Sequence, residues 1–337
     1  MNPLHFSFII PVYNRPDEVE ELLISFKALK GDLPFEIVIV EDGSQLDCKS
    51  VIAQFEDDLD ISYYFKPNSG PGDSRNYGMQ KAKGNYFIIL DSDCLLPSQY
   101  LVTVNSYLSS NYVDCFGGPD AAHASFSNLQ KAINFAMTSF ITTGGIRGGK
   151  ASHKTFQPRS FNMGLSKKAF LESGGFGRIH PGEDPDLSIR LNNLGYKTVL
   201  ISDAFVYHKR RVSWKTFYNQ VHKFGLVRPV LNRWHPKTKK LTYWFPTVFS
   251  LGFVISIVLF FLNFIWPLLL YGVYVLLAFI LALLSTKNLS VAIQSILAIF
   301  IQFVGYGYGF LKSTFAISVL KKNPQKRFPK LFFKDAK

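Results

Sequence analysis

The tripeptide Asp91-Ser92-Asp93 is the stretch whose residue types and spacing most directly imply chemistry. It follows the apolar run Tyr86–Leu90, which is too short for an independent helix and rich in residues that favour strands. Two carboxylates at i and i+2 leave a strand end on the same side, and their repulsion disfavours the pair unless a cation lies nearby. Such oxygen ligands suit Mg²⁺ or Mn²⁺ carrying a substrate phosphate. The alternative is a polar strand end that leads into a turn.

Apolar runs separated by helical patterns position this tripeptide. Strands are predicted at Phe6–Val12, 35–40, 61–65 and Tyr86–Leu90. Continuously apolar strands that alternate with helices indicate a parallel sheet covered on both faces, an α/β fold. Ligands of such sheets bind at the carboxyl ends of the strands. Polar clusters occur at those ends, at Tyr13-Asn14, Asp42-Gly43-Ser44, 68–75 and Asp91-Ser92-Asp93.

These clusters together resemble the family-2 glycosyltransferases of GT-A fold. The resemblance lies in residues 8–14, 40–44, 68–76 and 91–93. It implies a Rossmann-like, mostly parallel sheet and a nucleotide-sugar donor, with a UDP-sugar the first choice. The donor-binding residues that it implies are Pro11, Val12, Tyr13, Asn14, Asp42, Asn68, Arg75, Asp91 and Ser92. Asp93, with Asp91, would bind the Mg²⁺ or Mn²⁺ ion on the donor diphosphate. Glu41, Ser74 and Arg15 depart from the common pattern, and Arg15 leaves the base and the sugar open.

A second acidic cluster begins at Gly182 and contains Glu183, Asp184 and Asp186. The apolar periodicity after it predicts a helix, so the acids lie at a helix N-terminus, where caps are common. The resemblance implies instead that Asp184 is the catalytic base and that Glu183 orients the acceptor or shares its hydrogen bonds. It also implies that His208, which follows a late strand at 197–202, is a further metal ligand; the alternative is a structural histidine.

Two basic segments accompany these clusters. The glycine-rich run 142–152, with Arg147 and Lys150, would fold over a diphosphate or else serve as a solvated linker. Lys209, Arg210 and Arg211 would offset diphosphate charge or face anionic lipid.

Charge and hydropathy divide the 337 residues into two parts. Residues 1–203 contain 18 Lys and Arg against 23 Asp and Glu, whereas residues 204–337 contain 19 Lys and Arg against one acid, Asp335. A basic part that is also apolar favours a membrane surface over nucleic acid, whose binding modules it does not match. The three scattered cysteines, Cys48, Cys94 and Cys115, indicate a reducing compartment and buried thiols. The N-terminus lacks the basic region of a signal peptide, so we expect the first domain to stay on the side of synthesis.

The apolar part predicts membrane helices. Residues 245–285 carry no charge and are long enough for two passes, with a break at 263–267; residues 289–311 could form a third pass or a re-entrant or in-plane helix. Positive-inside counting favours a cytosolic catalytic domain in a bacterial cytoplasmic (inner) membrane, but three passes would place the basic tail outside. The predicted segments are a catalytic domain at 1–211, an amphipathic linker at 212–243, membrane helices at 244–320 and a basic tail at 321–337.

These patterns predict an inverting, metal-dependent glycosyltransferase. Its acceptor would be a lipid-linked or other saccharide, within cell-envelope polysaccharide synthesis. One alternative is a polyprenyl-phosphate sugar synthase, whose phosphate nucleophile has less need of a base. A second alternative, of a different class, is a membrane scaffold that binds a nucleotide sugar without turnover.

Overall fold

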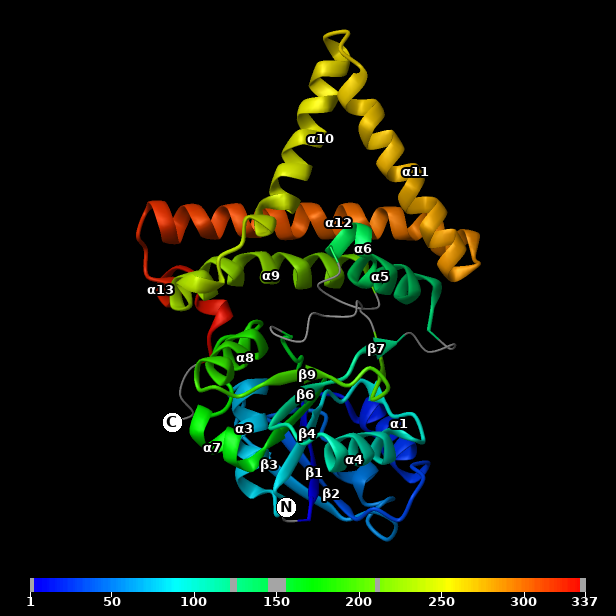
Figure 1. The fold of residues 1–337 in the computed structure, drawn as a ribbon, viewed down its shortest axis with the longest axis vertical. Helices are drawn as coiled ribbons and strands as arrows, with labels where there is room; N and C mark the ends of the chain where they lie inside the picture. The colour runs from blue at the N-terminus through cyan, green and yellow to red at the C-terminus, as the bar shows by residue number, and fades with distance from the viewer. Residues whose placement is uncertain (1–2, 122–125, 145–155, 210–212, 334–337) are drawn as a thin grey trace. The chain divides into compact units, whose positions relative to one another are not determined.

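The computed structural model describes residues 3–121, 126–144, 156–209 and 213–333. The chain forms two compact units. The sheet unit consists of Met1–His123, Ala151–His208 and Phe332–Lys337, and the helical unit consists of Ala124–Lys150 and Lys209–Leu331. The ribbon is shown in Figure 1.

A seven-stranded sheet, in the order β3-β2-β1-β4-β8-β6-β9, forms the centre of the sheet unit. Its strands are β1 (Phe6–Val12), β2 (Phe35–Asp42), β3 (Ile61–Lys66), β4 (Tyr86–Leu90), β6 (Cys115–Gly117), β8 (Asn162–Ser166) and β9 (Thr198–Leu200). The first four strands pair in parallel, as predicted. Strand β8 was not predicted, and it runs antiparallel between β4 and β6. Its Gly164 lies directly against the ring of Phe116, which a side chain at that position would overlap.

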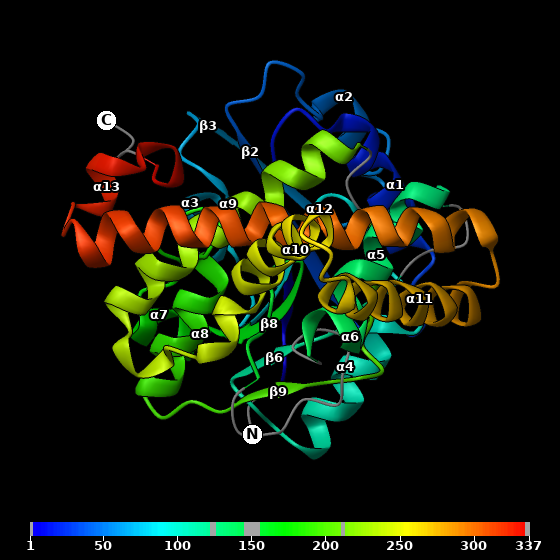
Figure 2. The same ribbon diagram turned by 90° about the horizontal axis from the view of Figure 1, so that it is seen from above.

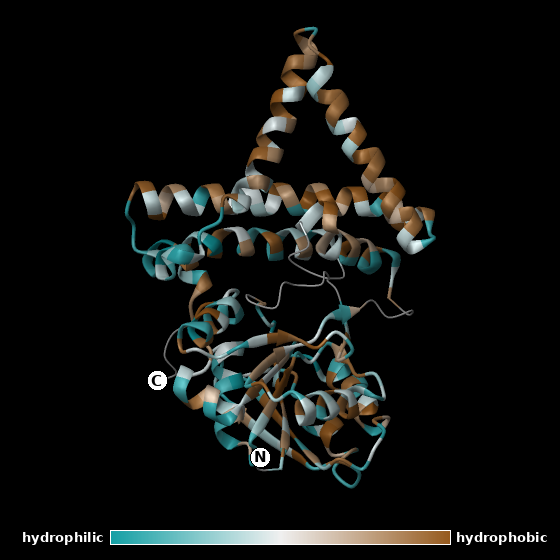
Figure 3. Ribbon diagram, viewed as in Figure 1, coloured by the Kyte–Doolittle hydropathy of each residue, from teal (hydrophilic) through white to brown (hydrophobic). Residues whose placement is uncertain are grey.

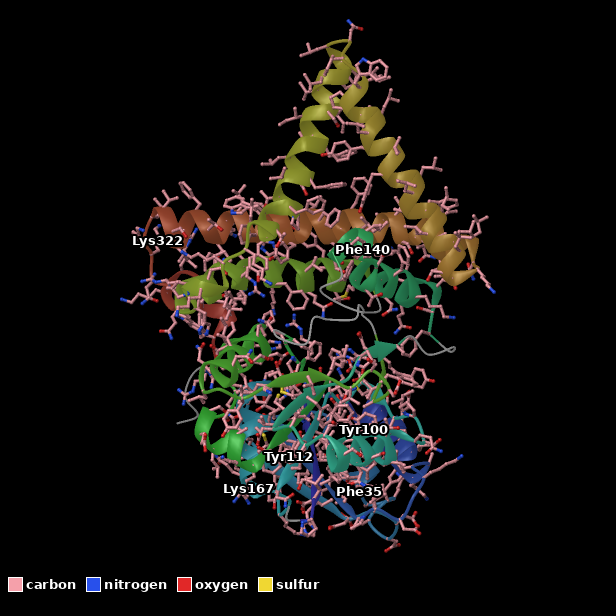
Figure 4. The ribbon with its side chains drawn as sticks, viewed as in Figure 1. Phe35, Tyr100, Tyr112, Phe140, Lys167 and Lys322 are labelled. Carbon is pink, nitrogen blue, oxygen red and sulfur yellow. The ribbon has the colours of Figure 1, made fainter. Side chains whose placement is uncertain are left out.

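Helices cover both faces of this sheet, as the apolar strands require. They are α1 (Pro16–Lys27), α2 (Lys49–Ile52), α3 (Pro71–Lys81), α4 (Tyr100–Ser110), α7 (Lys167–Ser173) and α8 (Glu183–Asn193). Alternate residues of β1 enter opposite cores: Phe8 packs with α1 and α4, and Ile9 packs with α3. Phe35 and Tyr100, labelled in Figure 4, lie with their rings 5.4 Å and 6.4 Å from that of Phe8.

A small second sheet, in the order β5-β10-β7, completes the sheet unit. Its strands are β5 (Cys94–Leu95), β7 (Asp120–Ala121) and β10 (Val206–His208). The antiparallel pairing of β10 with β5 places His208 opposite Cys94. A residue more than a hundred positions away thus lies beside the Asp91-Ser92-Asp93 tripeptide.

The helical unit contains the long apolar helices. Its helices are α5 (Asn128–Thr138), α6 (Phe140–Thr143), α9 (Trp214–Trp234), α10 (Phe245–Phe261), α11 (Trp266–Thr286), α12 (Leu289–Thr314) and α13 (Pro324–Arg327). Short 3₁₀ turns occupy Pro236–Thr238, Leu241–Trp244 and Pro329–Leu331, and a π-helical turn occupies Phe315–Val319. Figures 1 and 2 show α9 and α12 side by side, with α10 and α11 leaving them as a hairpin.

Three helices of the described chain are long and apolar enough to cross a membrane: Leu241–Phe261, Trp266–Thr286 and Leu289–Val319. The predicted break between the first two lies at residues 262–265. Figure 3 shows α10 and α11 hydrophobic along most of their length. Helix α9 lies within residues 212–243, the predicted amphipathic linker, and buries Phe217 and Val221 within the helical unit, with Val221 against Gly305 of α12.

Candidate active site

The loops that follow β1 and β2 are joined by hydrogen bonds from Asn14. Its amide donates to the Ser44 hydroxyl at 2.7 Å, and its side-chain oxygen accepts from the Gln45 and Leu46 amides at 2.7 Å and 3.0 Å. Asn14 adopts a left-handed backbone conformation (φ 53°), which asparagine tolerates better than most residues. The predicted donor-binding turn is therefore fixed to the end of the neighbouring strand.

The carboxylate of Asp42 organises the next turn. It accepts hydrogen bonds from the Ser69 and Gly70 amides, both at 2.9 Å, and from the Lys66 ammonium at 2.6 Å. The Asn68 side chain donates to the Asp42 carbonyl at 2.8 Å. Asp42 is 4% exposed, and its carboxylate oxygens thus accept hydrogen bonds largely from the protein itself. The sequence alone did not predict these hydrogen bonds between Asp42 and the turn at Ser69 and Gly70.

The remaining donor-binding candidates differ in accessibility. Tyr13 is 52% exposed and presents its ring to solvent, and Pro11 is half-buried. Val12 is buried in the core, so only its backbone can face a ligand. Ser92 is almost buried, and its hydroxyl lies 3.4 Å from a Glu18 carboxylate oxygen.

Carboxylate and imidazole ligand atoms converge after β4. The Nε2 of His208 lies 3.1 Å from Asp93 Oδ1 and 4.0 Å from Asp91 Oδ2. The imidazole stacks on the Phe161 ring, with centroids 4.7 Å apart, which holds the ring plane in place. Asp93 and His208 also form a group with Cys94 whose ligand atoms lie within 4.8 Å of one another.

The chemistry of these donors fits a hard divalent cation held by Asp93, Asp91 and His208. Two carboxylates and an imidazole are suitable ligands for Mn²⁺, and the carboxylates also suit Mg²⁺. The Cys94 thiol is a poor fourth ligand, because burial and the charges of Asp93 and Asp91 raise its pKa well above the ordinary value. It donates instead to the Phe161 carbonyl at 3.4 Å. The prediction that Cys94 is a buried thiol is confirmed.

Arg75 links this group to the second acidic cluster. Its guanidinium is 2.7 Å from Asp91 Oδ1 and 3.2 Å from Glu183 Oε1, and its side chain is 4% exposed. Burial alone lowers the pKa of Arg75, but the carboxylates of Asp91, Glu183 and Asp184 raise it further than burial lowers it. The Arg75 side chain therefore stays charged between the carboxylates of Asp91 and Glu183, which come from two motifs far apart in the sequence.

The adjacent acids of α8 have opposite pKa displacements. Burial raises the pKa of Glu183, but His180 and Arg75 outweigh it and lower the value to about 2. Burial and the Glu183 charge raise the pKa of Asp184 above its ordinary value. Asp184 Oδ1 is buried and has no hydrogen-bond partner among the described residues. Glu183 is thus held as a paired carboxylate, whereas Asp184 has the environment of a proton acceptor.

His180 is the member of this network that the sequence reading missed. Its Nδ1 lies 2.8 Å from Glu183 Oε1, the same oxygen that Arg75 approaches. The signal available in the sequence was its position three residues before Glu183. Among the basic candidates, Arg147, Lys150, Arg210 and Arg211 lie outside the described residues.

Parts of this chain are similar to known proteins. Residues 7–171 match the family model of glycosyl transferase family 2. An uncharacterized glycosyltransferase of Rickettsia conorii is 40% identical over 95 residues, which cover 28% of this chain and 16% of the relative. A GalNAc(5)-diNAcBac-PP-undecaprenol beta-1,3-glucosyltransferase of Campylobacter jejuni is 28% identical over 191 residues, or 55% of this chain and 59% of the relative. The chain spans less than two thirds of the length of these curated relatives.

Among solved structures, the mannosyltransferase PcManGT from Pyrobaculum calidifontis, in complex with GDP-Man and Mn²⁺, is similar with a TM-score of 0.55 at 15% identity. The match covers 96% of this chain and 89% of that protein. The sheet unit, with its mostly parallel sheet and its polar loops at the carboxyl ends of the strands, thus has the GT-A fold. Residues 7–171, which the family model matches, contain strands β1 to β8 of this unit together with residues 124–150 of the helical unit.

Proposed function

We propose that this chain is an inverting glycosyltransferase that moves a sugar from a nucleotide-sugar donor to an acceptor hydroxyl. The observation that carries the proposal is the continuous network from Asp93 through His208, Asp91 and Arg75 to Glu183, the neighbour of Asp184. It connects a group of metal-ligand atoms to a carboxyl with a raised pKa. Both are what a displacement at an anomeric carbon requires.

In this mechanism Asp184 takes the proton of the acceptor hydroxyl at its unpartnered Oδ1. The acceptor oxygen then attacks the anomeric carbon from the face opposite the nucleotide, forming the new glycosidic bond as the bond to the diphosphate breaks. A Mg²⁺ or Mn²⁺ ion bound by Asp93, Asp91 and His208 would offset the charge of the leaving diphosphate. Arg75 holds Asp91 in place, and Glu183 keeps Arg75 in position.

The donor side of the proposal uses the loops after β1, β2 and β4. Tyr13, Asn14 and the backbone at Pro11 and Val12 would contact the base. Asp42, Asn68 and Ser92 would shape the ribose and diphosphate pocket, with Asp42 acting mainly through the turn that it stabilises. We propose a UDP-sugar as the donor, and a panel of UDP- and GDP-sugars tests that choice.

The acceptor that we propose is lipid-linked. The Campylobacter relative is named for an undecaprenol-diphosphate saccharide, and this chain carries three helices suited to a membrane. Such an acceptor would present its sugar at a membrane surface. The corresponding cellular place is the bacterial cytoplasmic membrane, with the sheet unit in the cytosol.

The decisive experiment compares Asp184→Asn with Asp186→Asn in the full chain. Both changes remove an acid from the first turn of α8 and so weaken the same helix terminus. Asp184→Asn should lower transfer by roughly 10²–10⁴-fold while donor binding, measured by calorimetry with Mn²⁺, is retained. Asp186→Asn, which loses a pair with Arg190, should keep turnover within a few-fold. An equal loss of transfer activity in both variants would mean that Asp184 only stabilises the N-terminus of α8 and is not the base.

The acceptor and the stereochemistry are tested in the same assay. NMR of the purified product reports whether the anomeric configuration is inverted. Transfer to polyprenyl phosphate that survives Asp184→Asn would identify a polyprenyl-phosphate sugar synthase instead. Nucleotide-sugar binding without any product from the donor and acceptor panel would favour a non-catalytic scaffold.

A further inference from the structure

Helix α12 has two faces of different character. Its exposed large apolar residues recur every three, four or seven positions and form one stripe along the helix. They are Leu289, Ile293, Leu297, Val304, Tyr308 and Leu311. At 3.6 residues per turn these six residues occupy an arc of about 100°. It continues through Phe315 and Val319, beyond the helix end. A stripe of this kind, open over the whole length of a helix, requires an apolar partner.

The other side of α12 is occupied by protein. A Cβ at Gly305 would lie 2.6 Å from Val221 of α9, and one at Gly309 would overlap the His222 carbonyl. A Cβ at Gly307 would lie 2.8 Å from the Pro246 carbonyl at the start of α10. The buried share of the most apolar window is 39% in α12 but 11% in both α10 and α11. Only the stripe is therefore available to lipid, whereas α10 and α11 are open on most sides.

The chain returns to the sheet unit after these helices. Phe332 forms a β-bridge with Ile179, and the Phe333 amide donates to the Arg178 carbonyl at 3.1 Å. The Phe333 ring lies against Gly70 and is 6.2 Å from the His180 ring. Backbone pairing requires both segments to be on one side of a membrane. The number of crossings between the two segments must then be even, which three passes would violate.

The distribution of basic residues also supports an even number of membrane crossings. Lysines precede α10, separate α11 from α12 and follow α12: Lys237, Lys239, Lys240, Lys287, Lys321, Lys322, Lys326 and Lys330. The connection between α10 and α11, Leu262-Asn263-Phe264-Ile265, has no charged residue. With two crossings, every one of these lysines lies on one side and the uncharged connection lies on the other, as the positive-inside rule favours. Lys322, which follows the π-helical turn after α12, is labelled in Figure 4.

We propose that the chain crosses the bilayer twice, through α10 and α11, and that α12 lies in the surface of the bilayer on the side of the sheet unit. The exposed stripe of α12 then contacts acyl chains, and the lysines at its ends meet anionic headgroups. The hairpin that α10 and α11 form above α9 and α12 has the geometry this requires (Figures 1 and 2). This inference goes beyond the proposed reaction and does not depend on it.

Cysteine accessibility in the full chain tests the proposal. The three native cysteines are buried, so the unaltered chain serves as the blank for a membrane-impermeant maleimide. Single exposed reporters are Ser50→Cys in the sheet unit, Leu262→Cys between α10 and α11, Ser290→Cys at the start of α12 and Lys326→Cys after it. Each is labelled in right-side-out and in inverted membrane vesicles.

Two crossings predict that Ser50→Cys, Ser290→Cys and Lys326→Cys react in one vesicle orientation and Leu262→Cys in the other. Labelling of Lys326→Cys together with Leu262→Cys would mean that α12 crosses the bilayer, and it would overturn the proposal. Labelling of all four reporters from one side would show that the α10–α11 hairpin does not cross the bilayer, and this result would also overturn the proposal. Detergent-solubilised protein, in which all four must react, controls for reporters that are merely buried.

Discussion

The two units of this protein differ in how they hold charge. All 24 Asp and Glu residues belong to the sheet unit, and the helical unit contains none in its sequence although it carries 20 Lys and Arg. In the sheet unit the acids face cations at fixed distances, as Asp91 and Glu183 face Arg75. Acids that fix the position of cations suit a binding site, whereas cations without acids suit attraction to an anionic surface.

The largest effect in this comparison should come from Arg75→Met. Removal of the guanidinium leaves Asp91 without its arginine partner and the buried Glu183 with His180 alone, which costs about 3–5 kcal/mol of unfolding free energy. The matched control is Arg15→Met, whose exposed pair with Glu18 is worth about 0–1 kcal/mol. All four tryptophans lie in the helical unit, so the readout must be hydrogen exchange of peptides from the sheet unit. Equal effects of the two variants would contradict the role given to Arg75.

Packing rather than charge should dominate in the helical unit. In Gly225→Ala the added methyl group meets the Tyr306 carbonyl of α12, a backbone atom that cannot rotate away, so we expect a loss of about 1–3 kcal/mol. Gly272→Ala in α11 is the control, because no atom lies within 4 Å of its added methyl group and alanine favours helices. Tryptophan fluorescence during thermal unfolding reports this unit. A loss in the control as large as that in Gly225→Ala would indicate a general intolerance of α-helical substitutions.

The pH dependence should separate Asp184 from the other acids. Its folded-state pKa is raised, so the folded chain binds this proton more tightly than the unfolded chain, and stability falls as pH rises through the interval between the two values. Asp184→Asn removes that fall and should make the protein more stable at neutral pH but not at a pH below both values. Each unit of pKa displacement corresponds to about 1.4 kcal/mol. Transfer by the unaltered enzyme should decline as acid protonates Asp184. A variant that is equally stabilised at every pH would argue against a raised pKa.

The smallest effect should come from the C-terminal contact. Phe333→Ala removes a half-buried ring from Gly70 and His180, which should cost about 1 kcal/mol, and should speed amide exchange near Arg178. Phe65→Ala, a ring 55% exposed on the same unit, should leave that exchange unchanged. Unchanged exchange in Phe333→Ala would mean that the segment binds through its backbone alone.

Strong local patterns made most of the fold predictable. The apolar runs that became β1, β2 and β4 bury both of their faces, so composition alone identifies them. The acidic cluster at the start of α8 and the break between α10 and α11 were also predicted from strong local patterns in the sequence. Strand β8 was not predicted, because its own residues, with Gly164 among them, favour strands only weakly. It is held in the sheet by its pairing with β4 on one side and β6 on the other.

The sequence by itself determined which residues are candidates for chemistry and how charge is divided between the units, because residue type and short spacing are local properties. Only the tertiary structure decided their partners: His208 beside Asp93, Glu183 on Arg75, and Asp42 on the amides of the turn after β3. Those pairings join residues separated by 27 to more than 100 positions. Strand register and helix packing set such contacts, and both depend on the whole core rather than on the neighbours of any one residue.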